Sequence, residues 1–205
     1  MRDVPLLLDG VGSRFKGGRL YVHGTDIVAW LDSWIQHVAI GGQLAAIEFK
    51  KPLTHQGTLV LLQDESLWDP ETIAATGHFY IAGASFPFCV FPSPMRITQQ
   101  DAFDEDALMA QVHMEDEATV SLTATDTATL MEHVSSAMKV LCAATLPKYG
   151  SAWWFVRCKL LAALPRGFTK IKLKRVRVLA GSMVVAEVTV DDTPLGRVSY
   201  VARKP

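Results

Sequence analysis

VHGTDIVAWLD, from Val22 to Asp32, is the stretch that decides the fold. It places a His-Gly pair before an apolar run and a carboxylate nine positions after the histidine. Apolar residues continue at helical spacing to Val38, and Gly41-Gly42 follow as a typical helix stop. The pattern predicts a long amphipathic helix with its N-cap at Thr25-Asp26, because such side chains accept hydrogen bonds from the unpaired N–H groups of a first turn.

Composition limits the class of protein. The chain has 205 residues, of which 49% are hydrophobic, and this is enough for a sizeable core. A formal net charge of −1 favours neither nucleic acid nor an anionic membrane as a partner. The N-terminal MRDVPLLLDG is too short in apolar residues for a signal peptide or a membrane span. Cys89, Cys142 and Cys158 lack C-x-x-C spacing, so we expect buried free thiols, no metal site and a soluble cytoplasmic protein.

A second segment echoes the first one 100 residues later. Leu20–Asp32 aligns with Val120–Glu132, so that Thr125-Asp126 lies opposite Thr25-Asp26 and Glu132 opposite Asp32. Another apolar helical pattern then follows, from Leu130 to Leu141. Strand-like segments come after each helix: LAAIEF and TLVLL in the first half, and WWFVRCKLLAAL, TKIKLKRVRVL, VVAEVTV and RVSYVA in the second. Each half therefore predicts one long helix followed by antiparallel strands.

Between the halves lies an acidic, proline-punctuated stretch. Seven acidic residues occur between Phe91 and Ala118, which is typical of a solvated connector with a short helix. We therefore predict an N-terminal half at residues 1–95, a connector at 96–118 and a C-terminal half at 119–205.

A helix wrapped by an antiparallel sheet and repeated in tandem resembles the α+β double hotdog arrangement. VHGTDIVAWLD resembles the H-G-G-x-x-x-x-L-x-D/E stretch of hotdog acyl-CoA thioesterases of the phenylacetate-pathway and hydroxybenzoyl-CoA types. His23, Gly24, Leu31 and Asp32 match this stretch, and Thr25 replaces the second glycine. IEFKKPLTHQGTLVLL resembles the strand, turn and strand that follow the helix in hotdog proteins. The resemblance covers Leu20–Leu62 well, and the second half only in pattern.

A second resemblance points to another reaction. Asp32-Ser-Trp-Ile-Gln36 is similar to the E-x-x-x-Q of β-hydroxyacyl-carrier-protein dehydratases, and VPLLLDGV is similar to their P-x-L-L-x-D stretch. Their H-F-P-G stretch is absent from this chain. The dehydratase resemblance therefore lacks the histidine that its mechanism requires.

The resemblance implies roles for four residues. Thioester hydrolysis needs donors at the carbonyl oxygen and a base or nucleophile near the carbon. The Gly24 N–H, at a helix start, and His23 would supply the donors. Asp32 falls about 140° from Ile27 around the helix, at the edge of the apolar face, where desolvation favours a raised pKa and use as base or nucleophile. Gln36 would support it. The alternatives are a structural His23 and a solvated or capping Asp32.

The second half predicts a weaker site and a cationic face. Glu132 retains a carboxylate, but Thr123-Ala124 occupies the position of the His-Gly pair. The simplest interpretation is a fused pair in which one of two pseudo-symmetric sites has lost its hydrogen-bond donors for the substrate oxygen. Basic residues cluster on the later strands, where they are either a solvated face or a landing site for coenzyme A phosphates or an acyl carrier protein. The candidates are Arg157, Lys159, Lys170 and Lys172. Nucleic acid is not expected, because exposed aromatic residues are not interleaved.

Taken together, these features predict an enzyme acting on acyl-CoA or acyl-carrier-protein thioesters, most simply a thioesterase (a hydrolase) without a cofactor. A β-hydroxyacyl thioester dehydratase or hydratase that uses Asp32 or Glu132 is the alternative enzyme. A catalytically silent acyl-binding module is the alternative outside enzymes. A fused pair of hotdog units predicts a monomer, as a pseudo-dimer, or a homo-oligomer.

Overall fold

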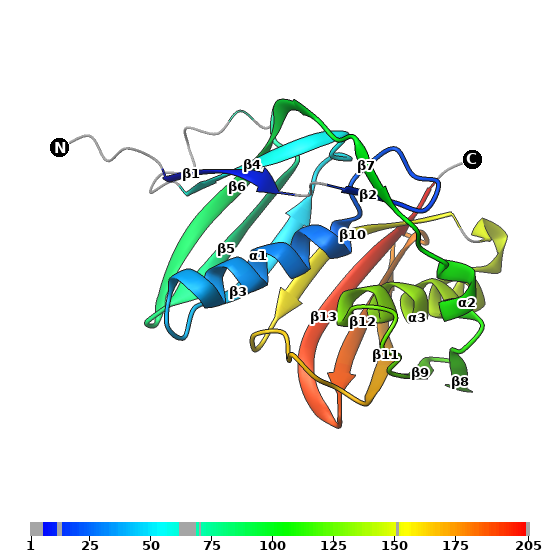
Figure 1. Ribbon diagram of the computed structural model, residues 1–205. Coiled ribbons are helices and arrows are strands. Elements are labelled where there is room, and N and C mark those ends of the chain that lie inside the picture. Colours follow the sequence, from blue (N-terminus) through cyan, green and yellow to red (C-terminus); the bar gives the residue numbers. More distant parts are fainter. Residues whose placement is uncertain (1–5, 12–13, 62–68, 70, 151, 204–205) are drawn as a thin grey trace. The chain divides into compact units, whose positions relative to one another are not determined.

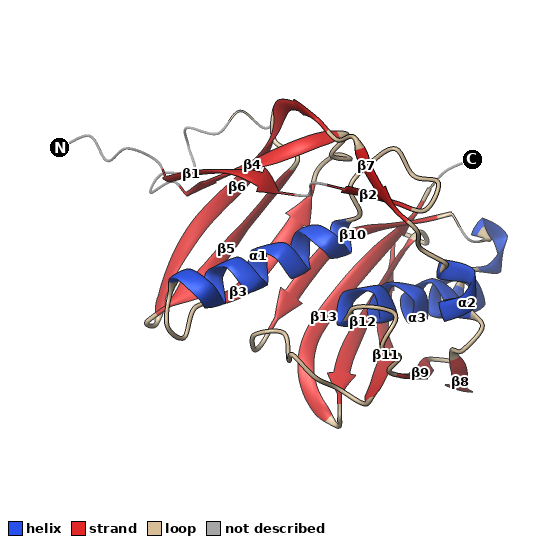
Figure 2. Cartoon of the chain, viewed as in Figure 1, coloured by secondary structure: helices blue, strands red, loops and turns tan. Residues whose placement is uncertain are grey.

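The computed structural model describes residues 6–11, 14–61, 69, 71–150 and 152–203. The chain divides into two compact units, Met1–Phe103 and Asp104–Pro205. Each unit combines an antiparallel sheet with one long helix (Figures 1 and 2).

In its described residues, unit 1 has a sheet with five antiparallel strands and the helix α1, Gly24–Val38. The strand order is β1-β4-β6-β5-β3, and each neighbouring pair is antiparallel. These strands are β1 Leu6–Val11, β4 His55–Leu61, β6 Ala84–Arg96, β5 Ala75–Ile81 and β3 Gln43–Phe49. A separate parallel pair joins β2, Arg14–Lys16, to β7, Gln99–Asp101, and the side chains of Arg14 and Asp101 form an ion pair of 3.1 Å.

The core of unit 1 lies between α1 and its sheet. Ile27, Leu31 and Ile35 are buried, and their spacing of four residues puts them on one face of the helix. Phe79 on β5 and Phe88 on β6 are also buried, with ring centroids 4.5 Å apart. The position of α1 is therefore set by apolar packing, and its polar residues take their places from that packing.

In its described residues, unit 2 has a six-stranded sheet, the short helix α2 and the long helix α3. The strand order is β10-β13-β12-β11-β9-β8. The elements are α2 Glu105–Met109, β8 His113–Asp116, β9 Thr119–Thr123, α3 Leu130–Thr145, the 3₁₀ turn η2 Pro147–Tyr149, β10 Trp153–Leu160, β11 Lys170–Leu179, β12 Met183–Val190 and β13 Thr193–Ala202. Along α3, every residue from Leu130 to Met138 is buried.

The two long helices and the strands that follow them are confirmed, but both predicted N-caps are wrong. The N-cap of α1 is His23, and that of α3 is Thr129. The strands β5 and β6 were not predicted from the sequence. The strand β6 contains Pro87, Pro92 and Pro94, which argue against a strand by local propensity, yet it pairs with neighbours on both sides. Tertiary pairing overrides local preference here.

The stretch predicted as a connector, residues 96–118, has more regular structure than expected. It contains β7, α2 and β8. The short helix was expected there, whereas β8 is an edge strand paired with β9. In the described part of the chain no helix is long and apolar enough to cross a membrane. The same residues contain no group of three or more His, Cys, Asp or Glu placed to hold a metal ion.

Candidate active site

The first turn of α1 carries the His-Gly pair. His23 has extended backbone angles, and its carbonyl oxygen accepts from the N–H of Asp26 and of Ile27, at 3.0 and 3.3 Å. The N–H groups of Gly24 and Thr25 make no hydrogen bond to other described residues. A helix start leaves such donors unpaired and adds the positive end of its dipole. Gly24 is the first residue of α1, and its use as an oxyanion donor stays a prediction.

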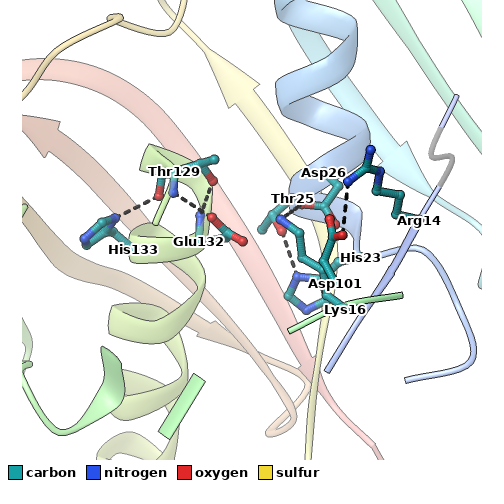
Figure 3. Close-up of polar contacts among 9 residues, drawn as sticks. All are labelled: Arg14, Lys16, His23, Thr25, Asp26, Asp101, Thr129, Glu132 and His133. Atoms are coloured by element: carbon teal, nitrogen blue, oxygen red, sulfur yellow. Dashed lines mark hydrogen bonds and ion pairs between the residues drawn. The ribbon is translucent and has the colours of Figure 1, made fainter. Parts of the chain in front are cut away.

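His23 lies in a polar and aromatic setting (Figure 3). Its side chain is buried, and Nδ1 lies 2.7 Å from the Thr25 hydroxyl oxygen. The ring of Phe103 lies 6.4 Å from the His23 ring, between centroids, and 5.8 Å below the ammonium of Lys16. Lys16 forms a largely buried ion pair of 2.7 Å with Asp26 in the first helical turn. These contacts attach β2 and the segment after β7 to the helix start that carries His23.

Asp32 is buried on the same helix. Its residue is 2% exposed, and Gln36, one turn later, donates from Nε2 to Asp32 Oδ2 at 2.5 Å. The alternative of a solvated carboxylate is therefore wrong. A capping role is wrong too, because Asp32 is the ninth residue of α1. Asp32 and Gln36 are brought together as expected, and a catalytic use of the pair stays a prediction.

The structure brings His23 to Thr25 and Asp32 to Gln36, but it separates these two pairs along the helix. Eight residues of continuous helix rise by about 12 Å from Gly24 to Asp32. The Asp32 side chain shortens this gap, because a helical Cα–Cβ bond tilts toward the N-terminus. A substrate that contacts both the His23–Gly24 pair and the Asp32 carboxylate therefore has to span most of the rise between Gly24 and Asp32.

Glu132 performs a structural task in unit 2. It is the third residue of α3, and its Oε2 accepts from the Thr129 N–H at 2.6 Å, while Thr129 Oγ1 accepts from the Glu132 N–H at 3.3 Å (Figure 3). This is a capping box, which the T-x-x-E spacing already indicates in sequence. The ninth residue of α3 is Met138, so the 100-residue alignment of Glu132 with Asp32 pairs different helical positions and is wrong.

His133 is likewise structural. It is fully buried, its Nδ1 lies 2.8 Å from the Thr129 carbonyl oxygen, and its Nε2 accepts from the Thr125 N–H at 3.1 Å. Both ring nitrogens thus bind the backbone around the start of α3. Adjacent helical residues point about 100° apart, so Glu132 and His133 are not placed to act as a dyad.

We expect Thr129→Ala to lower the free energy of unfolding by about 1 kcal/mol, because it removes the hydroxyl that caps α3. Chemical denaturation measures this loss. Turnover of any substrate handled by α1 should stay at the wild-type value. A large loss of turnover at unchanged stability would contradict the structural role of this cap.

The predicted cationic face contains a carboxylate that sequence reasoning missed. Lys170 and Lys172 on β11 lie 3.6 and 2.9 Å from the Glu115 carboxylate on β8. The hydrogen bond between Glu115 and Lys172 holds the pKa of the Glu115 carboxyl below its usual value. The same hydrogen bond raises the pKa of the Lys172 ammonium. Arg157 and Lys159 are exposed on β10. Glu115 lies outside the basic segment in sequence, so the sequence did not predict these ion pairs with Lys170 and Lys172.

The interior thiols match expectation. Cys89, Cys142 and Cys158 are free and buried. Burial raises the pKa of Cys89 to about 12 and that of Cys142 further still, because a thiolate is poorly solvated there. Cys89 and Cys142 are therefore packing residues at neutral pH.

No protein-family model and no curated protein sequence matches the chain. Solved structures do match. A protein from Thermobifida fusca YX that is named as a candidate thioesterase II aligns over 97% of this chain and 93% of its own, with a TM-score of 0.52 and 9% sequence identity. The chain has a hotdog fold.

Two further solved structures align over 98% of the chain with TM-scores of 0.49. One is a pyran synthase domain from module nine of the sorangicin pathway, at 10% identity and 93% of its own length. The other is a bifunctional dehydratase-cyclase domain of ambruticin biosynthesis, at 12% identity and 90%. The alignment with the Thermobifida fusca structure confirms the hotdog fold predicted from the VHGTDIVAWLD stretch, and the function is argued from the residues of α1.

Proposed function

We propose that this hotdog protein hydrolyses acyl thioesters of coenzyme A or of an acyl carrier protein, with Asp32 as general base. The observation that carries the proposal is a buried carboxylate held by Gln36 on the helix that starts with His23 and Gly24. We also propose that the chain is a double hotdog, with halves at 1–95 and 119–205 joined by residues 96–118, in a soluble cytoplasmic protein.

The start of α1 suits the oxygen that gains charge during hydrolysis. Attack on a thioester places negative charge on the carbonyl oxygen, and preorganised N–H donors stabilise this charge. The N–H of Gly24 has no hydrogen-bond partner among the described residues, and it lies at the positive end of the helix dipole. A glycine there leaves the approach to its N–H open, because it has no side chain. His23 adds a second donor beside it.

The length of α1 favours a base over a nucleophile. Direct attack by a carboxylate spans about 7 Å from the carboxylate oxygen to the oxyanion donor, counting the attack distance, the C=O bond and one hydrogen bond. An intervening water lengthens this span to about 10 Å. The rise of about 12 Å from Gly24 to Asp32, shortened by the lean of the Asp32 side chain, fits the longer arrangement. Asp32 would therefore activate a water, and Gln36 would hold the carboxylate.

The charge on β10 supports a binding site for the carrier part of the substrate. Arg157 and Lys159 are exposed cations that would meet the phosphates of coenzyme A or an acidic carrier protein. Lys170 and Lys172 could take part only if the phosphates displaced Glu115.

The experiment that tests the function is mass spectrometry of the protein incubated with saturated, aromatic and 3-hydroxyacyl thioesters of coenzyme A and of an acyl carrier protein. Release of thiol and free acid is the expected result. Gain or loss of water with the thioester intact would instead establish the hydratase or dehydratase, which the Asp32–Gln36 hydrogen bond also fits. Binding without turnover would establish a silent acyl-binding module.

The general-base role makes a separate prediction. Single-turnover hydrolysis in ¹⁸O-water should place the label in the released acid and leave the peptide that contains Asp32 unlabelled. Rapid acid quench during turnover should show no acylated protein, because a base forms no covalent intermediate. An acylated protein, or labelled Asp32, would show that Asp32 is the nucleophile.

A further inference from the structure

Thr25 stands where the resembling thioesterases have a second glycine, and it brings a hydroxyl to His23. Thr25 is 1% exposed, and its Oγ1 lies 2.7 Å from His23 Nδ1. Among the residues that the structure describes, His23 is the only hydrogen-bond partner of this hydroxyl. Glycine would offer His23 no such contact.

Hydrogen-bond accounting decides which atom donates. A hydroxyl has one proton to donate, and a buried donor left unpaired costs about 1–3 kcal/mol. If His23 Nδ1 carried a proton and donated it, the Thr25 proton would have no described acceptor. The arrangement that satisfies both groups has Thr25 donating to an unprotonated Nδ1. The neutral imidazole of His23 then carries its proton at Nε2.

His133 provides a contrast within the same chain. The N–H of Thr125 can only donate, so His133 Nε2 must accept, and the carbonyl of Thr129 can only accept, so Nδ1 must donate. Neutral His133 therefore carries its proton at Nδ1. By this reasoning the two buried histidines at the starts of α1 and α3 are opposite tautomers, and the hydrogen-bond partners near each helix start set the tautomer.

We propose that Thr25 is a positioning residue that fixes His23 as the Nε2–H tautomer, so that His23 donates a hydrogen bond to a substrate oxygen and does not act as a base. This inference rests on the proposed thioester hydrolysis, and it assigns separate roles to the two pairs of residues in that site. Thr25 and His23 serve the oxygen of the thioester, while Asp32 and Gln36 serve the water. The departure from the second glycine of the H-G-G stretch would thus have a function.

The tautomers are measured without substrate. Long-range ¹H–¹⁵N spectra of histidine-labelled protein, at a pH where the imidazoles are neutral, distinguish a protonated Nδ1 from a protonated Nε2. His23→Gln and His133→Gln each remove one set of signals and so assign them among the six histidines. We expect the Nε2–H pattern for His23 and the Nδ1–H pattern for His133. An Nδ1–H pattern for His23 would overturn the inference.

Two variants test the hydroxyl itself. Thr25→Val has the same shape without the hydroxyl, so His23 should lose its single-tautomer pattern while His133 keeps its own as an internal reference. Thr25→Ser should restore the wild-type pattern. We expect kcat to fall about tenfold in Thr25→Val at nearly unchanged KM, less than the loss of about 10²-fold or more when an oxyanion donor is removed outright.

The outcomes separate this inference from the function on which it rests. Unchanged kcat and tautomer in Thr25→Val would overturn the positioning role. Loss of kcat that Thr25→Ser does not restore would also count against the hydroxyl. A wild-type protein that hydrolyses no thioester would refute the proposed function and the donor role of His23, and the spectra would still test the Thr25–His23 hydrogen bond by themselves.

Discussion

Asp32→Asn is expected to lower kcat for thioester hydrolysis by about 10²- to 10⁴-fold, the range that a positioned general base contributes. Asparagine keeps the shape and can still accept the hydrogen bond from Gln36, but its amide cannot take a proton from water. KM should change little. The measurement is steady-state thiol release from the thioester that the wild-type protein cleaves fastest.

Glu132→Gln is the matched control for Asp32→Asn. Like Asp32, Glu132 is a buried carboxylate on a long helix, at 4% exposure, and glutamine can replace glutamate in a capping box. We expect nearly unchanged turnover and stability in this variant. Equal losses of turnover in the two variants would show that the effect is not specific to Asp32. Full activity of Asp32→Asn would remove Asp32 from the mechanism.

Gly77→Ala is expected to lower the free energy of unfolding by about 3 kcal/mol, because the core cannot accommodate the added methyl group. Gly77 lies on β5, where a Cβ would come 2.2 Å from the carbonyl oxygen of Ala46 on β3 and 2.5 Å from a ring carbon of Phe88 on β6. The carbonyl belongs to a strand backbone that carries α1 on its face, so it cannot move aside cheaply. Chemical denaturation measures the loss.

Gly167→Ala is the control for this effect. A Cβ at Gly167 meets no described atom within 4 Å, so its effect on stability should stay within about 0.5 kcal/mol. The same denaturation midpoint for Gly77→Ala and Gly167→Ala would contradict the close approach of β3 and β6 to β5.

Local periodicity is the part of the sequence that predicted structure well. Apolar spacing located α1 and α3, and β-branched runs located β3, β4 and β10 to β13. The helix starts were predicted poorly. The Thr-Asp pairs are good caps by composition, but His23 ends the extended segment before α1, and Thr129 forms a capping box with Glu132 in α3. Composition alone did not distinguish between neighbouring polar residues.

For the candidate site, the sequence by itself determined which residue types share a helix. His23, Gly24, Asp32 and Gln36 occur at spacings that a helix converts into a start with unpaired donors and a carboxylate at the edge of the apolar face. Local backbone geometry is enough for this, because it depends only on residues a few positions apart.

Only the tertiary structure decided how each of these groups is used. Burial of Asp32 depends on the packing of α1 against residues distant in sequence, and Glu115 reaches Lys172 only because β8 and β11 both pair with β9. The tautomer of His23 follows from the burial of Thr25, which turns an ordinary hydroxyl into a donor with one described partner. Desolvation and hydrogen-bond partners are set by packing between distant segments, so residue spacing along the chain does not determine them.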